Sequence, residues 1–86
     1  MRKVRLLYFG NGDFASNERI EDIRITFSED ILVEEITEDS WDHWNVRRLY
    51  GISKEPSCVV ASLTGSCISR FLGAIPTNDT LREIIT

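Results

Sequence analysis

The stretch "YGISKEPSCVV" (residues 50–60) says most about the fold, because it places a proline directly before a strongly apolar run. The run continues as "SCVVASL" (57–63), whose β-branched and apolar residues are typical of a strand inside a sheet. Proline cannot donate a hydrogen bond to a neighbouring strand, so it is unusual at the start of a central strand. Upstream, Gly51 is placed to end a helix in a left-handed conformation. The stretch therefore predicts a helix end, a short loop and a strand opened by Pro56.

The N-terminal part of the chain predicts a strand that runs into a helix. Residues 4–9, "VRLLYF", form a nearly continuous apolar run, which is typical of a strand buried on both faces. The helical pattern starts near Asn17, where Ser16 or Asp13 can accept a hydrogen bond from a free backbone N–H. The helix continues as an apolar stripe at Ile20, Ile23 and Phe27.

The rest of the chain predicts three more strands and two more helices. These are a strand at 31–37, a helix capped by Ser40 that ends at Tyr50, strands at 57–63 and 66–72 joined at Thr64-Gly65, and a last helix capped by Thr77 with Leu81, Ile84 and Ile85 on its buried face. The order is β-α-β-α-β-β-α, in which a helical crossover implies a parallel strand pair and the hairpin an antiparallel one. We therefore expect an α/β fold with a mixed four-stranded sheet and helices on both faces. A chain of 86 residues is expected to form a single domain, residues 1–86.

At three landmarks the chain resembles the thioredoxin and glutaredoxin superfamily. Members of that superfamily have a helix that ends in Tyr-Gly-Ile or Tyr-Gly-Val, a cis proline that opens a central strand, and a Gly-Ala pair before the last helix. Here Tyr50-Gly51-Ile52, Pro56 and Gly73-Ala74 match these landmarks in order. The resemblance covers essentially the whole chain. It implies a minimal thioredoxin-like fold and a cis peptide bond between Glu55 and Pro56.

The loop that would carry the family's redox chemistry has no sulfur in this chain. In redox-active members, the loop after the first strand holds Cys-x-x-Cys or Cys-x-x-Ser. The corresponding loop here is "GNGDFASN" (10–17), and residues 1–57 contain no cysteine. The chemistry needs a thiolate at the helix N-terminus, and neither Ser16 nor Asn17 can form a mixed disulfide. The resemblance thus implies a redox-inactive member, with no catalytic residue and no cofactor. A bound phosphate is also disfavoured, because Asp13 and Glu18 would repel it.

We expect the peptide groove of the family to persist as a binding site made by Asp13, Phe14, Glu55 and Pro56. In relatives, the residue before the cis proline presents its backbone to an extended peptide, and here that residue is Glu55. Phe14 would add an apolar contact, and the two carboxylates favour a protein or peptide partner with an apolar anchor and a nearby Lys or Arg. Two alternatives stay open: Phe14 folds inward, or Glu55 is simply solvated.

The pair Trp41 and Trp44 lies at i, i+3 in "SWDHWNVRRLY" (40–50). The family-like core positions of this helix are Val46 and Tyr50. We expect both tryptophans to cover the sheet edge and pack locally, since apolar stripes on helices are usually core. In the alternative, they stay at the surface and form an interface with a partner. His43, in the same segment, is expected on the helix surface.

The two cysteines support an alternative function, a thiol-dependent oxidoreductase that uses Cys67 or Cys58 in a displaced position. Cys58 is expected to be buried and inert, because burial raises the pKa of a thiol. A two-residue turn at Thr64-Gly65 would set Cys67 opposite Ser62 and Cys58 opposite Phe71, too far apart for a disulfide. No His or Cys pair has the spacing of metal ligands, so no metal is expected.

Composition narrows the classes of partner. The net charge is −4, and the ten Lys and Arg residues are scattered, which argues against a nucleic-acid surface. No apolar run approaches the length that spans a bilayer, and the basic start is too short for a signal peptide. Two cysteines in such a chain fit a reducing, cytoplasmic setting. The partner's identity and the oligomeric state are not set by the sequence.

Overall fold

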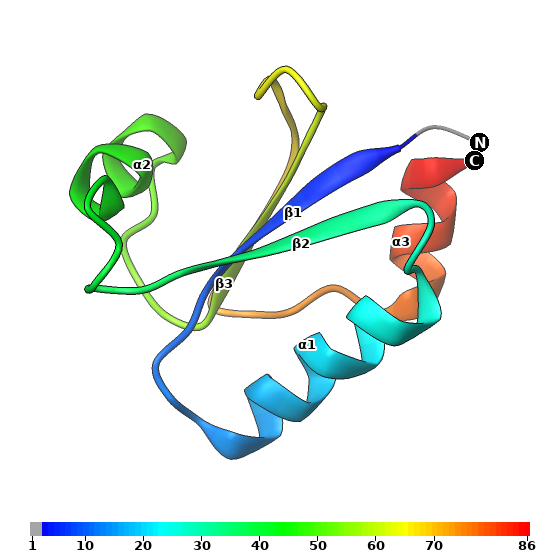
Figure 1. Ribbon diagram of the computed structural model, residues 1–86, viewed down its shortest axis with the longest axis horizontal. Helices are drawn as coiled ribbons and strands as arrows, with labels where there is room; N and C mark the ends of the chain where they lie inside the picture. The colour runs from blue at the N-terminus through cyan, green and yellow to red at the C-terminus, as the bar shows by residue number, and fades with distance from the viewer. Residues whose placement is uncertain (1–2) are drawn as a thin grey trace.

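A computed structural model describes residues 3–86 and confirms the predicted order β-α-β-α-β-β-α (Figure 1). The elements are β1 (Val4–Phe9), α1 (Phe14–Thr26), β2 (Ile31–Ile36), α2 (His43–Tyr50), β3 (Ser57–Ala61), β4 (Cys67–Leu72) and α3 (Asn78–Ile85). None of the helices in this part of the chain has the length and apolar character of a membrane span.

The four strands form one mixed sheet in the order β2-β1-β3-β4. β1 and β2 run parallel and are connected through α1, as the crossover predicted. β3 is antiparallel to both β1 and β4. Pro56 therefore precedes an inner strand, and the Glu55–Pro56 bond is cis, the isomer that the resemblance implies.

Helices cover both faces of the sheet, as predicted, with α1 and α3 on one face and α2 on the other (Figure 1). The α1–α3 face carries the larger cluster, in which Ile20, Ile23, Phe27, Leu81 and Ile85 pack on buried side chains of the sheet. The α2 face carries a smaller cluster, composed of Leu7, Phe9, Ile52, Val59 and Ala61, with Val46 and Tyr50 against it. β1 contributes to both clusters because alternate side chains point to opposite faces. That position explains its uninterrupted apolar sequence.

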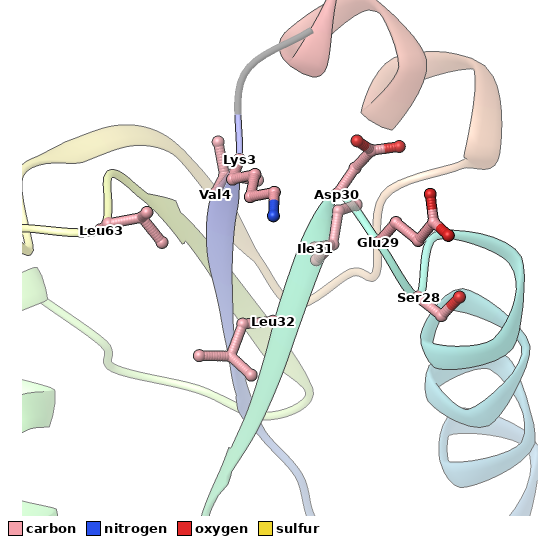
Figure 2. Close-up of a pocket in the computed structure, with 8 residues that line it drawn as sticks. All are labelled: Lys3, Val4, Ser28, Glu29, Asp30, Ile31, Leu32 and Leu63. Atoms are coloured by element: carbon pink, nitrogen blue, oxygen red, sulfur yellow. The ribbon is translucent and has the colours of Figure 1, made fainter.

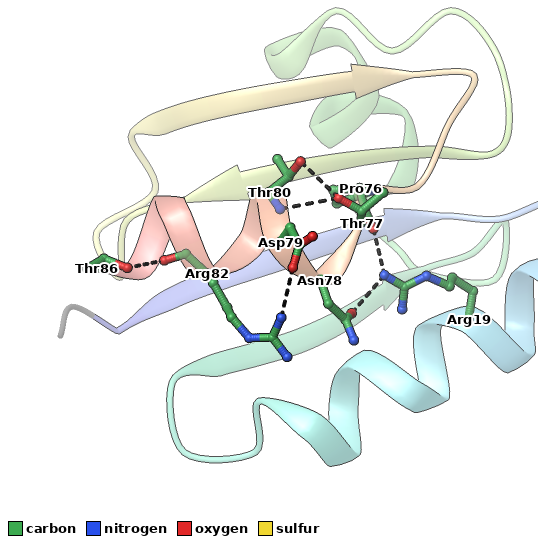
Figure 3. A network of polar contacts seen from close by, with 8 residues as sticks. All are labelled: Arg19, Pro76, Thr77, Asn78, Asp79, Thr80, Arg82 and Thr86. Atoms are coloured by element: carbon green, nitrogen blue, oxygen red, sulfur yellow. Dashed lines mark hydrogen bonds and ion pairs between the residues drawn. The ribbon is translucent and has the colours of Figure 1, made fainter.

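Arg19 of α1 connects α1 to the start of α3 (Figure 3). Its guanidinium donates to the carbonyl of Pro76 at 2.9 Å and to Oδ1 of Asn78 at 2.8 Å. Thr77 caps α3 as predicted, since its hydroxyl accepts from the N–H of Thr80 at 3.2 Å. The start of α3 is therefore held both by its own cap and by α1.

The structure corrects three predicted element ends. α1 begins at Phe14 rather than near Asn17, because Asp13 and not Ser16, the other predicted candidate, is its cap. α2 begins at His43, and Ser40 instead accepts from the N–H of Thr37 at 3.2 Å. Trp41 consequently lies before the helix. β2 ends one residue earlier than predicted, at Ile36.

The β3–β4 hairpin also differs from the predicted two-residue turn. The N–H of Ser62 donates to the carbonyl of Ser66 at 2.8 Å, which leaves a three-residue loop that contains Gly65 at φ 100°. An irregularity between Val60 and Ala61 then shifts the register, so Cys67 lies opposite Ala61 rather than Ser62. The strands are accordingly shorter than predicted. Cys58 lies opposite Phe71, as expected.

Candidate functional site

The loop between β1 and α1 is shaped by two glycines with different roles. Gly12 has φ 83°, a left-handed conformation that side chains rarely adopt. At Gly10, a Cβ would come within 2.6 Å of the ring of Tyr8, which is fully buried and has no room to move away. The loop thus needs glycine at both positions to turn from the strand into the helix.

The first turn of α1 is capped by Asp13, one of the predicted site residues. Its carboxylate Oδ2 accepts from the N–H and the hydroxyl of Ser16, both at 3.0 Å. The N–H of Asp13 in turn donates to Oδ1 of Asn11 at 2.9 Å. A carboxylate of the chain itself therefore occupies the helix N-terminus, where an anion would otherwise bind.

Phe14, the first residue of α1, lies at the surface. Its exposed fraction is 74 %, so the inward alternative is wrong. An exposed aromatic ring directly after the capping residue gives this corner of the molecule an apolar contact surface.

Hydrogen bonds of Ser57 hold the Pro56 loop in place. The hydroxyl of Ser57 donates to the carbonyl of Lys54 at 2.6 Å and accepts from the N–H of Gly73 at 3.1 Å. Ser57 is fully buried and was not singled out from the sequence. The signal that could have found it is a small polar residue at the first position of an apolar strand, where free loop groups need partners.

Glu55 lies in this loop and is exposed, but its carboxylate is not merely solvated. It forms an ion pair with the guanidinium of Arg47 on α2. The pair connects the loop to α2. Pro56, the next residue, is partly buried.

A hollow of about 400 Å³ lies between the opening loop, the end of β2 and Glu55. It is lined by Gly10, Asn11, Gly12, Glu35, Ile36, Thr37, Glu38, His43 and Glu55. Of these described lining residues, three are glutamates and none is Lys or Arg. The structure therefore brings Glu55 to the opening loop, as predicted, whereas Asp13, Phe14 and Pro56 do not line the hollow.

His43 was predicted at the surface, and this prediction was wrong. The residue is 3 % exposed, and its ring lies edge-on to Trp44 with the ring centres 4.8 Å apart. Its Nδ1 is buried without a hydrogen-bond partner among residues 3–86, which is uncommon for a buried polar atom. His43 lines the hollow together with Gly10, Asn11 and Gly12 of the opening loop. A lone histidine in a polar segment carries no sequence signal for such burial.

The tryptophans are exposed, so their predicted local packing was wrong. Trp41 is 95 % exposed and Trp44 is 68 % exposed. α2 contacts the sheet through Val46 and Tyr50, the predicted core positions, and this orientation leaves Trp44 on the outer side. Trp44 is accompanied by Arg47, whose guanidinium carbon lies 5.9 Å from the ring centre.

The two cysteines are free and lie in contrasting surroundings. Cys58 is fully buried, as expected, and burial raises the pKa of its thiol to about 12. Cys67 is exposed at the start of β4. No group of three or more His, Cys, Asp or Glu side chains within residues 3–86 is arranged to hold a metal ion.

Comparisons with known proteins identify the fold. The sequence matches no family model and no curated protein. Among solved structures, the chain is similar to a mutant thioredoxin from Halobacterium salinarum NRC-1, with a TM-score of 0.69, 22% identity, and coverage of 98% of this chain and 73% of that one. It is also similar to a malarial protein, with a TM-score of 0.70 and 15% identity over 96% of this chain and 94% of that one. For oxidised thioredoxin O2 from Arabidopsis thaliana the TM-score is 0.65 at 13% identity, over 95% of this chain and 71% of that one. At these identities, the likeness establishes a thioredoxin-like α/β fold and leaves activity to the chemistry of the site.

Proposed function

We propose that this thioredoxin-like chain is a non-redox binding module that recognises an extended segment of a partner protein or peptide beside the Pro56 loop. The supporting observation is the corner at residues 10–14. This strand-to-helix turn contains no cysteine. Its residues 10–12 line an acidic hollow, and Phe14, two residues further along the chain, is exposed. This corner offers a ligand a hollow and an exposed apolar side chain. Its loop lacks the cysteine sulfur that thiol–disulfide chemistry requires.

The residues divide into those that contact the partner and those that hold the site. Phe14 supplies an apolar contact, and Glu35 and Glu38 attract a Lys or Arg side chain toward the hollow. Glu55 already forms an ion pair with Arg47. Its carboxylate therefore attracts a partner's Lys or Arg less strongly than Glu35 and Glu38 do. Asp13 acts as a positioning residue, because its carboxylate caps α1 and fixes the direction of Phe14.

The alternative function, a thiol-dependent oxidoreductase with a displaced cysteine, has less support. Cys58 has a raised pKa, so near neutral pH it carries almost no thiolate to attack a disulfide. Cys67 is exposed, but it lies opposite Ala61, whereas the opening loop follows Phe9, which pairs with Ser57 at the other end of β3. Neither thiol belongs to the loop before α1, where the redox-active relatives place their cysteine.

The proposal is tested by selecting peptides from a random library on the folded chain. We expect enriched peptides with an apolar residue near a Lys or Arg, and backbone amide shifts at residues 10–14 and 54–57 in NMR spectra. Binding should weaken about tenfold in Phe14→Ala and much less in Phe14→Leu, which keeps an apolar side chain. Glu55→Lys should also weaken binding. Glu55→Gln should weaken it less, because this variant removes the negative charge without reversing it.

The matched control is the double variant Trp41→Ala/Trp44→Ala, which should bind the selected peptides like the wild type. If only this variant loses binding while it remains folded, the interface lies on the α2 side and the loop proposal fails. The redox alternative is tested separately with an insulin reduction assay. Activity in the wild type that disappears in Cys67→Ser or Cys58→Ser would move the chain to the oxidoreductase class.

A further inference from the structure

The outer edge of β2 is an unpaired strand edge with free backbone groups. The N–H of Val4 donates to the carbonyl of Asp30 at 3.0 Å, so Asp30 and every second residue after it face β1. The backbone groups of Val33 and Glu35 consequently point away from the sheet. Neither residue has a backbone hydrogen-bond partner on that side within residues 3–86. Two N–H and two carbonyl groups are therefore available along one line.

The two edges of the sheet differ in regularity. The other edge strand is β4, and its register with β3 shifts at Val60/Ala61. Such irregularities disfavour the pairing of a further strand with that edge. β2 keeps an unbroken register with β1 from Ile31 to Ile36. The β2 edge is thus the one that presents the spacing an added strand needs.

Negative charge predominates along the β2 edge, where Lys3, at the end near Leu32, is a nearby cation outside the strand. The segment from 29 to 39 contains no Lys or Arg, and its acidic residues are Glu29, Asp30, Glu34, Glu35, Glu38 and Asp39. The guanidinium of Arg5 forms a bidentate ion pair with the carboxylate of Glu34, with N–O distances of 3.0 and 2.8 Å, which neutralises the charge of Glu34. Glu35 is exposed. A second copy that paired antiparallel along this edge would place like charges against each other. A basic strand would instead be attracted to it.

An apolar contact lies beside the same edge. Leu32 is 57 % exposed and projects from β2 toward the side on which α2 lies. Figure 2 shows it near a hollow of about 260 Å³ whose other wall includes Leu63 of the hairpin. An apolar residue of an added strand could rest on Leu32 at this end, while its basic residues meet the carboxylates.

We propose that the outer edge of β2 receives an extended, basic segment of a partner protein as an additional strand of the sheet. The backbone groups of Val33 and Glu35 supply the pairing, and the surrounding carboxylates select Lys and Arg and exclude a second copy of the chain. This interface shares Glu35 with the hollow of the proposed site, but strand pairing does not depend on Phe14 or Pro56.

The test uses the end-blocked hexapeptide Lys-Val-Lys-Val-Lys-Val as a probe, with amide hydrogen exchange followed by NMR. We expect exchange at Val33 and Glu35 to slow about tenfold at a saturating peptide concentration. The amides of Leu32 and Glu34 already bond to β1 and should change little. The corresponding Glu-Val peptide should give no protection, and the effect of the Lys peptide should weaken with added salt.

Two further reagents separate strand pairing from simple charge attraction. The fully N-methylated Lys-Val peptide keeps every charge but has no backbone N–H to donate. Its methyl groups also prevent close approach to the strand edge, so it should give no protection. In the protein, Glu35→Pro removes an outward N–H without touching the bonds to β1, whereas Glu35→Gln removes the charge and keeps the N–H. The proline variant should lose binding about tenfold more strongly than the glutamine variant. If Glu35→Pro does not fold, the methylated peptide decides the question.

The proposal is overturned if the Lys peptide does not bind, if the methylated peptide binds equally well, or if binding leaves exchange at Val33 and Glu35 unchanged. A peptide that shifts only the amides of residues 10–14 binds at the loop site instead. That outcome would support the proposed function and count against the edge interface, so the two proposals fail independently.

Discussion

The two faces of the sheet are covered in very different ways. On one face, α1 and α3 together bury five large side chains against the strands, and Arg19 links the two helices. On the other, the short helix α2 rests on Val46 and Tyr50 and leaves Trp44 and Leu49 exposed. The α1–α3 face therefore holds most of the packing energy, since burial of apolar area is the main stabilising term.

The α2 face is held by polar contacts as well as by packing. The hydroxyl of Tyr50 donates to the carbonyl of Gly65 at 2.7 Å, and Arg70 donates to the carbonyl of Tyr50 at 2.9 Å. Gly51 ends the helix in the left-handed conformation, as predicted. A helix fixed in this way can present a surface without burying it. The two faces therefore differ in how their helices are attached to the sheet, because one relies on a larger apolar cluster and the other on a smaller cluster together with these hydrogen bonds.

The largest expected effect comes from breaking the α1–α3 face. Leu81→Ala removes a side chain that is fully buried in the larger cluster. We expect it to lower the free energy of unfolding by about 3 kcal/mol, because it loses apolar burial and leaves a cavity. Urea unfolding followed by circular dichroism measures this change. A loss below about 1 kcal/mol would show that the cluster is looser than its burial indicates.

A second effect on the same face depends on pH. In the fold, burial raises the pKa of Cys58 from 9.0 to about 12, so folding favours the neutral thiol. Its contribution to stability is complete below pH 9 and is lost as the pH rises toward 12. At pH about 10.5, we expect the wild type to have lost about 2 kcal/mol more than Cys58→Ala, each relative to its own stability at pH about 8. Unfolding by urea across this range gives the two slopes, and parallel slopes would contradict the prediction.

On the α2 face, the corresponding truncation should cost less. Val46→Ala removes two methyl groups from a side chain that is only partly buried against the smaller cluster. We expect a loss of about 1 kcal/mol in the free energy of unfolding. A loss as large as that of Leu81→Ala, in the same urea experiment, would erase the difference between the two faces.

The smallest effect is expected at the exposed tryptophan before α2. Trp41→Ala should change the free energy of unfolding by less than about 0.5 kcal/mol, because its side chain makes little contact with the rest of the chain. Thermal unfolding of this variant beside the wild type is sufficient. A clear destabilisation would mean that Trp41 packs against the molecule in solution, as the sequence pattern first indicated.

Local chemistry made much of this fold predictable from the sequence. The apolar run of β1, the caps Asp13 and Thr77, and the left-handed Gly51 each satisfy a requirement of nearby backbone groups, so short stretches indicate them. Pro56, directly before β3, is likewise indicated by a short stretch of sequence. These features also located the opening loop and the Glu55 loop, and the fold brings residues 10–12 and Glu55 to one hollow.

Features that depend on distant parts of the chain could not be read in this way. The burial of His43, the exposure of the tryptophans and the position of Cys67 opposite Ala61 depend on how α2 lies on the sheet and on a register shift in β3–β4. Ser57 is buried because its hydroxyl has partners in two separate loops. The amino-acid order was enough to place the strands and helices, because backbone hydrogen bonding and apolar periodicity are local properties. Which side chains face solvent was set only in the folded molecule, since that depends on which surfaces far apart in the chain pack together.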